Sequence, residues 1–236
     1  MSARPSSAGG HGTAGSVVAP ALIERFALET RLFHWLNAAP FIFLLTTGLL
    51  LLLPGVKAIN AGGHRLVALA HVVVGLALLA ALVVFSLLVR RRRLLADLRR
   101  ALTPEAGDAA WARFALWSAL GAKVAEPPSG KYNLGQKLSS AFWIGAVGGL
   151  IVTGVVLAIN YASKQFLDPA FVERVFPVHA VLAYLAVPLL AAHLYLALVN
   201  RATRPSLRGM LTGRVEAAWA RRHHARWVAE AEKVSE

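Results

Sequence analysis

Four stretches without Asp, Glu, Lys or Arg dominate this chain of 236 residues. Each is 24 to 26 residues long. At about 1.5 Å per residue, a helix of that length crosses a bilayer core of about 30 Å. With 57% hydrophobic residues, the composition is also too apolar for an ordinary soluble domain of this size. We therefore predict an all-α integral membrane protein, a four-helix bundle. Its predicted spans are 32–56, 66–89, 138–163 and 175–200.

The segments outside these runs differ in character. Residues 1–24 are rich in Ser, Gly and Ala and lack the basic start and apolar run of a signal peptide, so we predict a disordered tail. Residues 25–200 form the predicted membrane domain. In the loop between the second and third spans, aromatic residues at helical spacing predict a short interfacial helix around residues 111–117. The basic segment 201–236 is predicted to be a tail with a surface helix within 209–230.

The positive charges are distributed unevenly. Of the 25 Lys and Arg residues, 3 precede the first span, 10 lie between the second and third, and 8 follow the fourth, which makes 21 against 4 on the opposite face. The positive-inside rule then places both termini and the middle loop in the cytoplasm of a multi-pass protein of the bacterial inner membrane. The net charge of +13 is thereby explained by the membrane surface and its lipid, and we expect no nucleic-acid partner.

The chain contains no cysteine. This excludes disulfides, iron–sulfur clusters held by thiolates, and haem attached through a Cys-x-x-Cys-His motif. Any haem must therefore be held noncovalently, which leaves histidine as the main ligand type.

Four histidines lie within the predicted spans, at two matched depths. Counting along alternating helices puts His34 and His193 near the cytoplasmic face, and His71 and His179 near the outer face. His179 and His193 are 14 residues apart, close to four helical turns, so they leave the same face of one helix. Polar side chains inside a membrane usually face the protein interior and have a function there.

Pairs of imidazoles from facing helices are what bis-histidine ligation of a b-type haem requires. We predict two b haems, one bound by His34 and His193 and the other by His71 and His179. Zinc would leave its tetrahedral shell incomplete, and a proton relay would need Asp or Glu within the spans. A haem-free scaffold, in which the histidines pack helices, is the remaining alternative. We expect the other histidines to be solvated, because they fall in tails or loops: His11, His64, His223 and His224. Of these, His64 is expected to lie near a haem propionate together with Arg65.

Several glycines allow close approach to a helix. Gly75 lies on the same helical face as His71, where either a flat cofactor or a neighbouring helix could approach. Gly145 and Gly149 match the small-residue motif of packed membrane helices, and again a cofactor is the alternative neighbour.

The chain resembles the cytochrome b (gamma) subunit of membrane-bound formate dehydrogenases over about residues 25–227. The resemblance is carried by short motifs: Arg31-Leu-Phe-His34-Trp35, His71-Val-Val-Val-Gly75, Lys131-Tyr-Asn-Leu-Gly-Gln-Lys137, Thr153-Gly154, His179, His193-Leu-Tyr195, and a tail pattern from Gly209 to Trp227. The departures are a longer Ala-rich N-terminal tail and a different segment before His71, with its basic residue at Arg65.

The resemblance implies the same two pairs of haem ligands, and it implies that Asn133 and Gln136 lie at a quinone site beside the inner haem. It further implies an iron–sulfur (beta) subunit and a molybdenum- or tungsten-containing catalytic (alpha) subunit as partners. The chain would then be the quinone-reducing electron-transfer subunit of an oxidoreductase complex, with formate oxidised on another chain. An equivalent cytochrome b subunit of a hydrogenase or of a thiosulfate or polysulfide reductase is the alternative.

Overall fold

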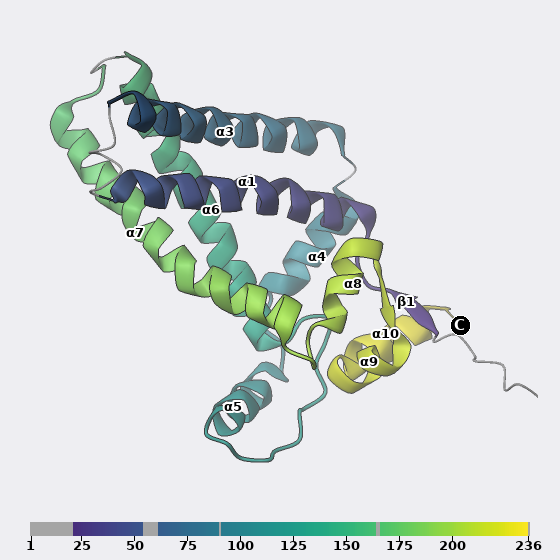
Figure 1. The fold of residues 1–236 in the computed structure, drawn as a ribbon. Helices are drawn as coiled ribbons and strands as arrows, with labels where there is room; N and C mark the ends of the chain where they lie inside the picture. Colours follow the sequence, from purple (N-terminus) through teal and green to yellow (C-terminus); the bar gives the residue numbers. More distant parts are fainter. Residues whose placement is uncertain (1–20, 54–60, 90, 164–165, 236) are drawn as a thin grey trace, which may run out of the picture.

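The computed structural model describes residues 21–53, 61–89, 91–163 and 166–235. Within these residues, four helices are long and apolar enough to cross a membrane (Figure 1). They are α1 (Leu28–Leu52), α3 (Ala61–Leu88), α6 (Leu134–Ser163) and α7 (Pro169–Leu194), the last continued by the π-helical turn η1 (Tyr195–Val199). The four predicted spans are thus present as helices.

All four of these helices begin earlier than the charge-free runs. Helix α1 includes Glu29 in its first turn, and α6 begins at Leu134. Helix α7 begins at Pro169, where the Asp168 side chain accepts a hydrogen bond of 2.9 Å from the Ala170 N–H. Charged and capping residues belong to the helix although they lie outside the apolar core, so a search for charge-free runs finds the membrane-buried part and misses the ends.

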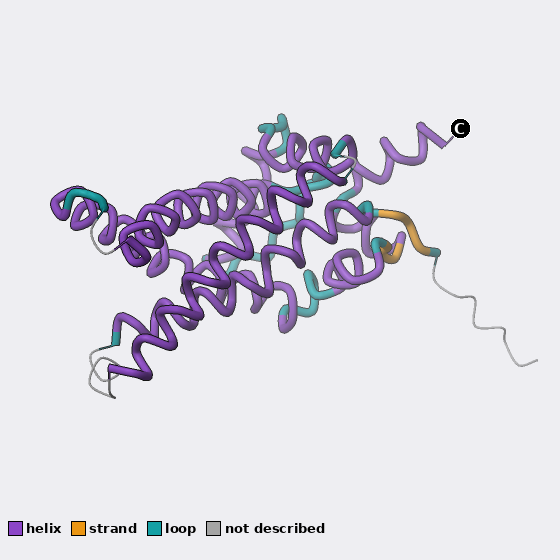
Figure 2. The backbone as a smooth tube through the Cα atoms, turned by 90° about the horizontal axis from the view of Figure 1, so that it is seen from above, coloured by secondary structure: helices purple, strands orange, loops and turns teal. Residues whose placement is uncertain are grey.

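The long helices pack as two antiparallel hairpins, α1 with α3 and α6 with α7 (Figures 1 and 2). Gly149 allows the close approach of α6 and α7, because a Cβ there would lie 2.8 Å from Cδ1 of Leu182. Gly145 has open space around its missing side chain, so only one half of the predicted small-residue motif is used in packing. A Cβ at Gly75 would lie 3.8 Å from Cδ2 of Leu44 on α1, which favours helix packing at that position.

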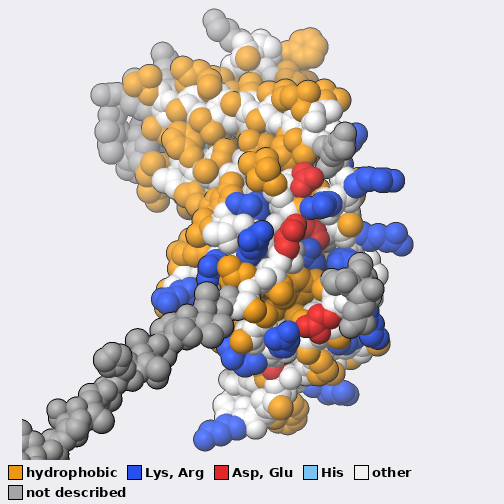
Figure 3. Space-filling view, turned by 90° about the vertical axis from the view of Figure 1, so that its right-hand side faces the viewer, with side chains coloured by type: hydrophobic (Ala, Val, Ile, Leu, Met, Phe, Trp, Pro, Cys, Tyr) orange, Lys and Arg blue, Asp and Glu red, His pale blue; other side chains and the backbone are white. Residues whose placement is uncertain are grey.

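The remaining elements lie at one end of the long helices, which we call the basic end (Figure 1). Figure 3 views the molecule from this side and shows Lys and Arg side chains spread over it, with a few acidic residues among them. The elements are β1 (Leu22–Glu24), α4 (Arg92–Leu102), α5 (Asp108–Ala119), α8 (Pro205–Thr212), β2 (Arg214–Glu216), α9 (Ala217–His223) and α10 (Ala225–Ser235).

The C-terminal segment is not the single surface helix that its periodicity predicts. Gly213, at φ 86°, ends α8 in the left-handed region, and its carbonyl accepts hydrogen bonds from the N–H groups of Arg25 and Phe26. Strand β2 then pairs with β1 in antiparallel register, with Ile23 opposite Val215. This two-stranded ladder is absent from the all-α prediction, because its partners lie at opposite ends of the sequence.

Trp219 and Trp227 are buried in a small core of their own with Val215, Ala220 and Val228. Strand β1 therefore pairs with β2 and packs against the C-terminal helices. Both ends of the described chain are held at the basic end of the bundle by these contacts.

Candidate haem and quinone sites

The structure brings the four intramembrane histidines together in two pairs. The ring centroids of His34 on α1 and His193 on α7 lie 6.3 Å apart, with the rings inclined at 49°. Those of His71 on α3 and His179 on α7 lie 6.2 Å apart, at 76°. These are the two pairs that counting by depth predicts. Each pair joins one helix of the first hairpin to α7 of the second.

The separation within each pair fits one metal ion between two imidazoles. With metal–nitrogen bonds of about 2.0 Å, and about 1.1 Å from each nitrogen to its ring centroid, two imidazoles on opposite sides of a metal ion have centroids about 6.2 Å apart. The observed 6.2 and 6.3 Å agree with this value. Two neutral nitrogen donors, with no thiolate or carboxylate beside them in the spans, suit an iron held in a porphyrin.

The His34 pair lies next to a rigid connection between α1 and α8. The indole Nε1 of Trp35 donates a hydrogen bond of 3.1 Å to the carbonyl of Met210, and Nε of Arg31 donates one of 3.3 Å to the same oxygen. The Trp35 ring also packs edge-on against His34, at 5.0 Å between centroids. The start of α1, and with it His34, is therefore anchored to the basic end.

The other pair is supported by two threonines. Oγ1 of Thr47 lies 2.9 Å from Nδ1 of His71, and Oγ1 of Thr153 lies 2.8 Å from Nδ1 of His179. Sequence reasoning missed this role. The available signal was a Thr-Gly pair in each of two spans, Thr47-Gly48 and Thr153-Gly154, at the depth of the outer histidines.

Asn133 and Gln136 form a reciprocal cap at the start of α6. The Gln136 side-chain oxygen accepts from the Asn133 N–H at 3.1 Å, and the Asn133 side-chain oxygen accepts from the Gln136 N–H at 3.0 Å. This is a capping box, which satisfies backbone donors that the first helical turn leaves free. The carbonyl oxygens are thereby used, while both side-chain amide groups keep their donor hydrogens. Their role at quinone stays a prediction.

A buried arginine connects the N-terminal, middle and C-terminal segments at the basic end. Arg25 is 2% exposed, and its guanidinium lies 5.1 Å from the Trp219 ring centroid and 5.7 Å from that of Trp227. Its Nη2 donates to the Lys131 carbonyl at 3.0 Å. Burial lowers the pKa of Arg25 to about 10, against the opposing effect of Tyr132 and Asp97. Arg25 thus remains a cation at neutral pH, stabilised by aromatic rings.

His224 lies in the same cluster and corrects one prediction. It was expected to be solvated, yet it is 1% exposed and its Nδ1 donates a 2.9 Å hydrogen bond to the Gly130 carbonyl. Burial, and then the nearby Arg25 cation, lower its pKa to about 3.

The side chain of His223 is partly buried, and its Nδ1 lies 2.7 Å from a carboxylate oxygen of Glu126. The predictions for His11, His64 and Arg65 concern side chains outside the described part of the chain.

The paired imidazoles in a four-helix membrane bundle agree with a comparison of the sequence with known families. The model of prokaryotic cytochrome b561 matches residues 25–213, which is most of the chain. The chain belongs to the prokaryotic cytochrome b561 family. A cytochrome of the b type holds haem b without covalent attachment, so the family implies haem b as a cofactor of this chain.

Curated relatives of this cytochrome b561 chain include subunits of formate dehydrogenases. It is 27% identical over 212 residues to the formate dehydrogenase cytochrome b556 subunit of Haemophilus influenzae, covering 88% of this chain and 83% of the relative. It is 27% identical over 218 residues to the formate dehydrogenase cytochrome b556(fdo) subunit of Escherichia coli K12, covering 91% and 95%. The nitrate-inducible cytochrome b556(Fdn) subunit of the same organism is 34% identical over 107 residues, covering 44% and 46%.

Proposed function

We propose that this chain is the membrane cytochrome b subunit of a formate dehydrogenase complex. It accepts electrons from an iron–sulfur subunit at the outer face and delivers them to quinone near the cytoplasmic face. Support comes from relatives that are named as formate dehydrogenase cytochrome subunits and that this chain matches over most of their length. The formate-oxidising molybdenum or tungsten site belongs to a separate catalytic subunit in this proposal.

The observation that carries the proposal is the presence of two imidazole pairs in one bundle, each with the centroid separation of bis-imidazole coordination. His71 and His179 would hold an outer haem, and His34 and His193 an inner one. When bound, haem b supplies one-electron redox chemistry, and the protein supplies ligation, spacing and polarity. The two pairs share α7, so a single helix fixes their separation through the 14-residue spacing of His179 and His193.

Quinone is proposed to bind beside Asn133 and Gln136, at the start of α6 on the basic end. Their amide N–H groups are free to donate to a quinone carbonyl oxygen, because only their oxygens are engaged in the capping box. Reduction of quinone takes up protons, and at this face they come from the cytoplasm. Oxidation of formate at the opposite face then generates a membrane potential.

The first experiment is a reduced-minus-oxidised spectrum of the purified chain, together with quantitative pyridine haemochrome analysis. We expect two haems b per chain, reduced by formate in the native membrane. Two haems that respond only to hydrogen or to a quinol would move the chain to a hydrogenase or to a thiosulfate or polysulfide reductase. Absence of haem from the folded chain would contradict the proposal.

Ligand substitution tests the pairing. His193→Ala should remove the inner haem and stop quinone reduction, while the outer haem remains reducible by formate. His223→Ala is a matched control outside the spans and should retain both haems. Loss of both haems to the same extent in a folded His193→Ala variant would contradict the assignment of the pairs.

A further inference from the structure

His71 and His179 are each contacted by a threonine from the other helix of their own hairpin. Thr47 is on α1 and reaches His71 on α3, while Thr153 is on α6 and reaches His179 on α7. Both contacts join the threonine hydroxyl to Nδ1, the ring nitrogen that a haem ligand bound through Nε2 leaves free. Two separate hairpins therefore repeat one arrangement around one pair of imidazoles.

The hydroxyl hydrogens determine which partner donates. Oγ1 of Thr47 also lies 2.9 Å from the Phe43 carbonyl oxygen, and Oγ1 of Thr153 lies 2.6 Å from the Gly149 carbonyl oxygen. A carbonyl can only accept and a hydroxyl has one hydrogen, so each threonine donates to its own helix and accepts from the imidazole. Both imidazoles are thereby held with the proton on Nδ1, and the lone pair of Nε2 is free to bind a metal.

A glycine follows each threonine and leaves room for the ring. A Cβ at Gly48 would lie 3.2 Å from Cε1 of His71, and a Cβ at Gly154 would lie 3.4 Å from Cε1 of His179. The first distance is shorter than an ordinary carbon–carbon contact, so a side chain at Gly48 would crowd the His71 ring, whereas one at Gly154 would just reach van der Waals contact with the His179 ring. Each threonine therefore fixes the proton position of its histidine, and Gly48 also leaves the room that the His71 ring occupies.

The inner pair lacks this support. Over the described residues, no hydrogen bond involves the ring nitrogens of His34 or His193, and the aromatic contacts of these rings are with each other and, for His34, with Trp35. A hydrogen bond from Nδ1 makes an imidazole ligand more basic, and a more basic ligand stabilises oxidised iron over reduced iron. The two pairs therefore differ in the electron donation they offer to iron.

We propose that Thr47 and Thr153 are positioning residues that orient His71 and His179 through Nδ1 and lower the midpoint potential of the outer haem relative to the inner haem. The inference rests on the proposed function in assigning a haem to each pair. A lower potential outside and a higher one inside favours the passage of each electron inward toward quinone. The two hydroxyl groups thus favour the step from the outer haem to the inner haem.

The test is a potentiometric titration of the purified chain carrying Thr47→Val or Thr153→Val, with haem content measured on the same samples. Valine keeps the shape of threonine and removes the hydroxyl. We expect two haems per chain. The lower midpoint potential should rise by about 59 mV, which corresponds to a tenfold change in the equilibrium constant of a one-electron reduction. The higher potential should stay unchanged.

Two variants control for changes in packing. Thr47→Ser keeps the hydroxyl and should restore the wild-type potential. Thr46→Val removes the neighbouring hydroxyl, which is exposed and bonds at 2.8 Å to the Ile42 carbonyl of its own helix, and should leave both potentials unchanged. Unchanged potentials in both Thr→Val variants, with two haems still present, would overturn the inference while leaving the proposed function intact. Absence of haem from the wild-type chain would instead contradict the proposed function itself.

Discussion

His224 is buried in the cluster that closes the basic end, and its environment makes this cluster sensitive to acid. Its Nδ1 donates to the Gly130 carbonyl, and its ring lies 5.4 Å from the Trp219 ring. Burial holds its pKa at about 3, below the usual 6.5. The folded protein therefore keeps His224 neutral at pH values where the unfolded chain binds a proton.

We predict that the cluster loses stability as the pH falls from about 6.5 toward 3. In this window the unfolded state binds one proton more than the folded state, so the free energy of unfolding decreases by about 1.4 kcal/mol for each pH unit. Above pH 6.5 the contribution is fully present. Tryptophan fluorescence between pH 7 and pH 4 measures the change, in a chain whose other four tryptophans are replaced by Phe so that the signal comes from Trp219 and Trp227.

A His224→Gln variant keeps an amide donor for Gly130 and removes the titrating group, so its fluorescence should vary less with pH. His223→Gln alters the adjacent residue, which contacts Glu126 near the surface, and should retain the acid sensitivity of the wild type. Equal acid sensitivity in His224→Gln and the wild type would contradict this prediction.

The role of single residues follows from the sequence only where a pattern extends over many positions. The depths of the four span histidines follow from counting along apolar runs, and the pairs that result are the pairs that the structure brings together. The burial of His224 could not be predicted, because it depends on contact with Arg25 and Gly130, which are remote in sequence. The contact of Thr47 with His71 likewise depends on the rotation of two packed helices.

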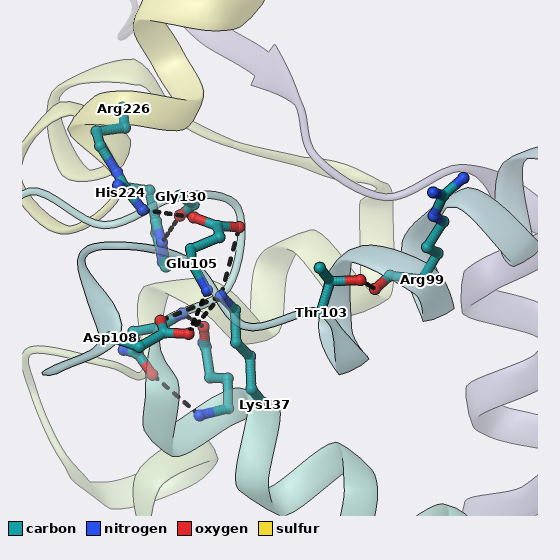
Figure 4. A network of polar contacts seen from close by, with 10 residues as sticks. Arg99, Thr103, Glu105, Asp108, Gly130, Lys137, His224 and Arg226 are labelled. Carbon is teal, nitrogen blue, oxygen red and sulfur yellow. Dashed lines mark hydrogen bonds and ion pairs between the residues drawn. The ribbon is translucent and has the colours of Figure 1, made fainter. Parts of the chain in front are cut away.

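At the scale of elements, a charged network connects α5, α6 and α10. The Lys137 amine on α6 lies 3.0 Å from an oxygen of Asp108 on α5 and 3.4 Å from one of Glu105 in the preceding turn. Glu105 also pairs with Arg226 on α10, and Figure 4 shows Glu105 between the two cations. The Lys137 side chain is 5% exposed, so its charge is neutralised by these carboxylates with little help from water.

Lys137→Met should destabilise the chain by about 3 kcal/mol, because it leaves Asp108 partly buried without its cation and leaves Glu105 with Arg226 alone. Lys123→Met, at an exposed position between α5 and α6, should have almost no effect. Unfolding of the detergent-purified variants, followed by circular dichroism, measures the difference. Adding Asp108→Asn to Lys137→Met should recover part of the loss, and strict additivity of the two changes would contradict a direct interaction.

The elements differ in how well their sequence predicts them. The membrane helices are recognised because about twenty apolar residues are needed to cross a bilayer, a constraint that acts within each helix. The predicted helix near Trp111 corresponds to α5, whereas the C-terminal surface helix is replaced by α8, β2, α9 and α10. That segment folds on contacts with the N-terminal strand, which helical periodicity does not encode.

At the scale of the whole molecule, each hairpin contributes one histidine to each pair. Thr47 and Thr153 each support a histidine of their own hairpin, and the histidine pairs form between hairpins. A metal group held by one such pair would join the hairpins, in addition to the packing of Phe41 and Leu45 on α1 with Ala186 on α7. Haem binding should therefore stabilise the bundle as well as equip it for electron transfer.

In the proposed function, the orientation of the bundle determines which way electrons cross the membrane, and the 21-to-4 distribution of basic residues predicts that the basic end is cytoplasmic. Because the chain has no cysteine, a single introduced cysteine reports its own location. Phe166, 78% exposed before α7, and Ala122, exposed after α5, lie at opposite ends. In intact cells a membrane-impermeant maleimide should label Phe166→Cys, and it should label Ala122→Cys only after the membrane is opened. The reverse pattern would put the Asn133 and Gln136 cluster at the outer face, so quinone reduction there would take up protons from outside and the proposed generation of a membrane potential would fail.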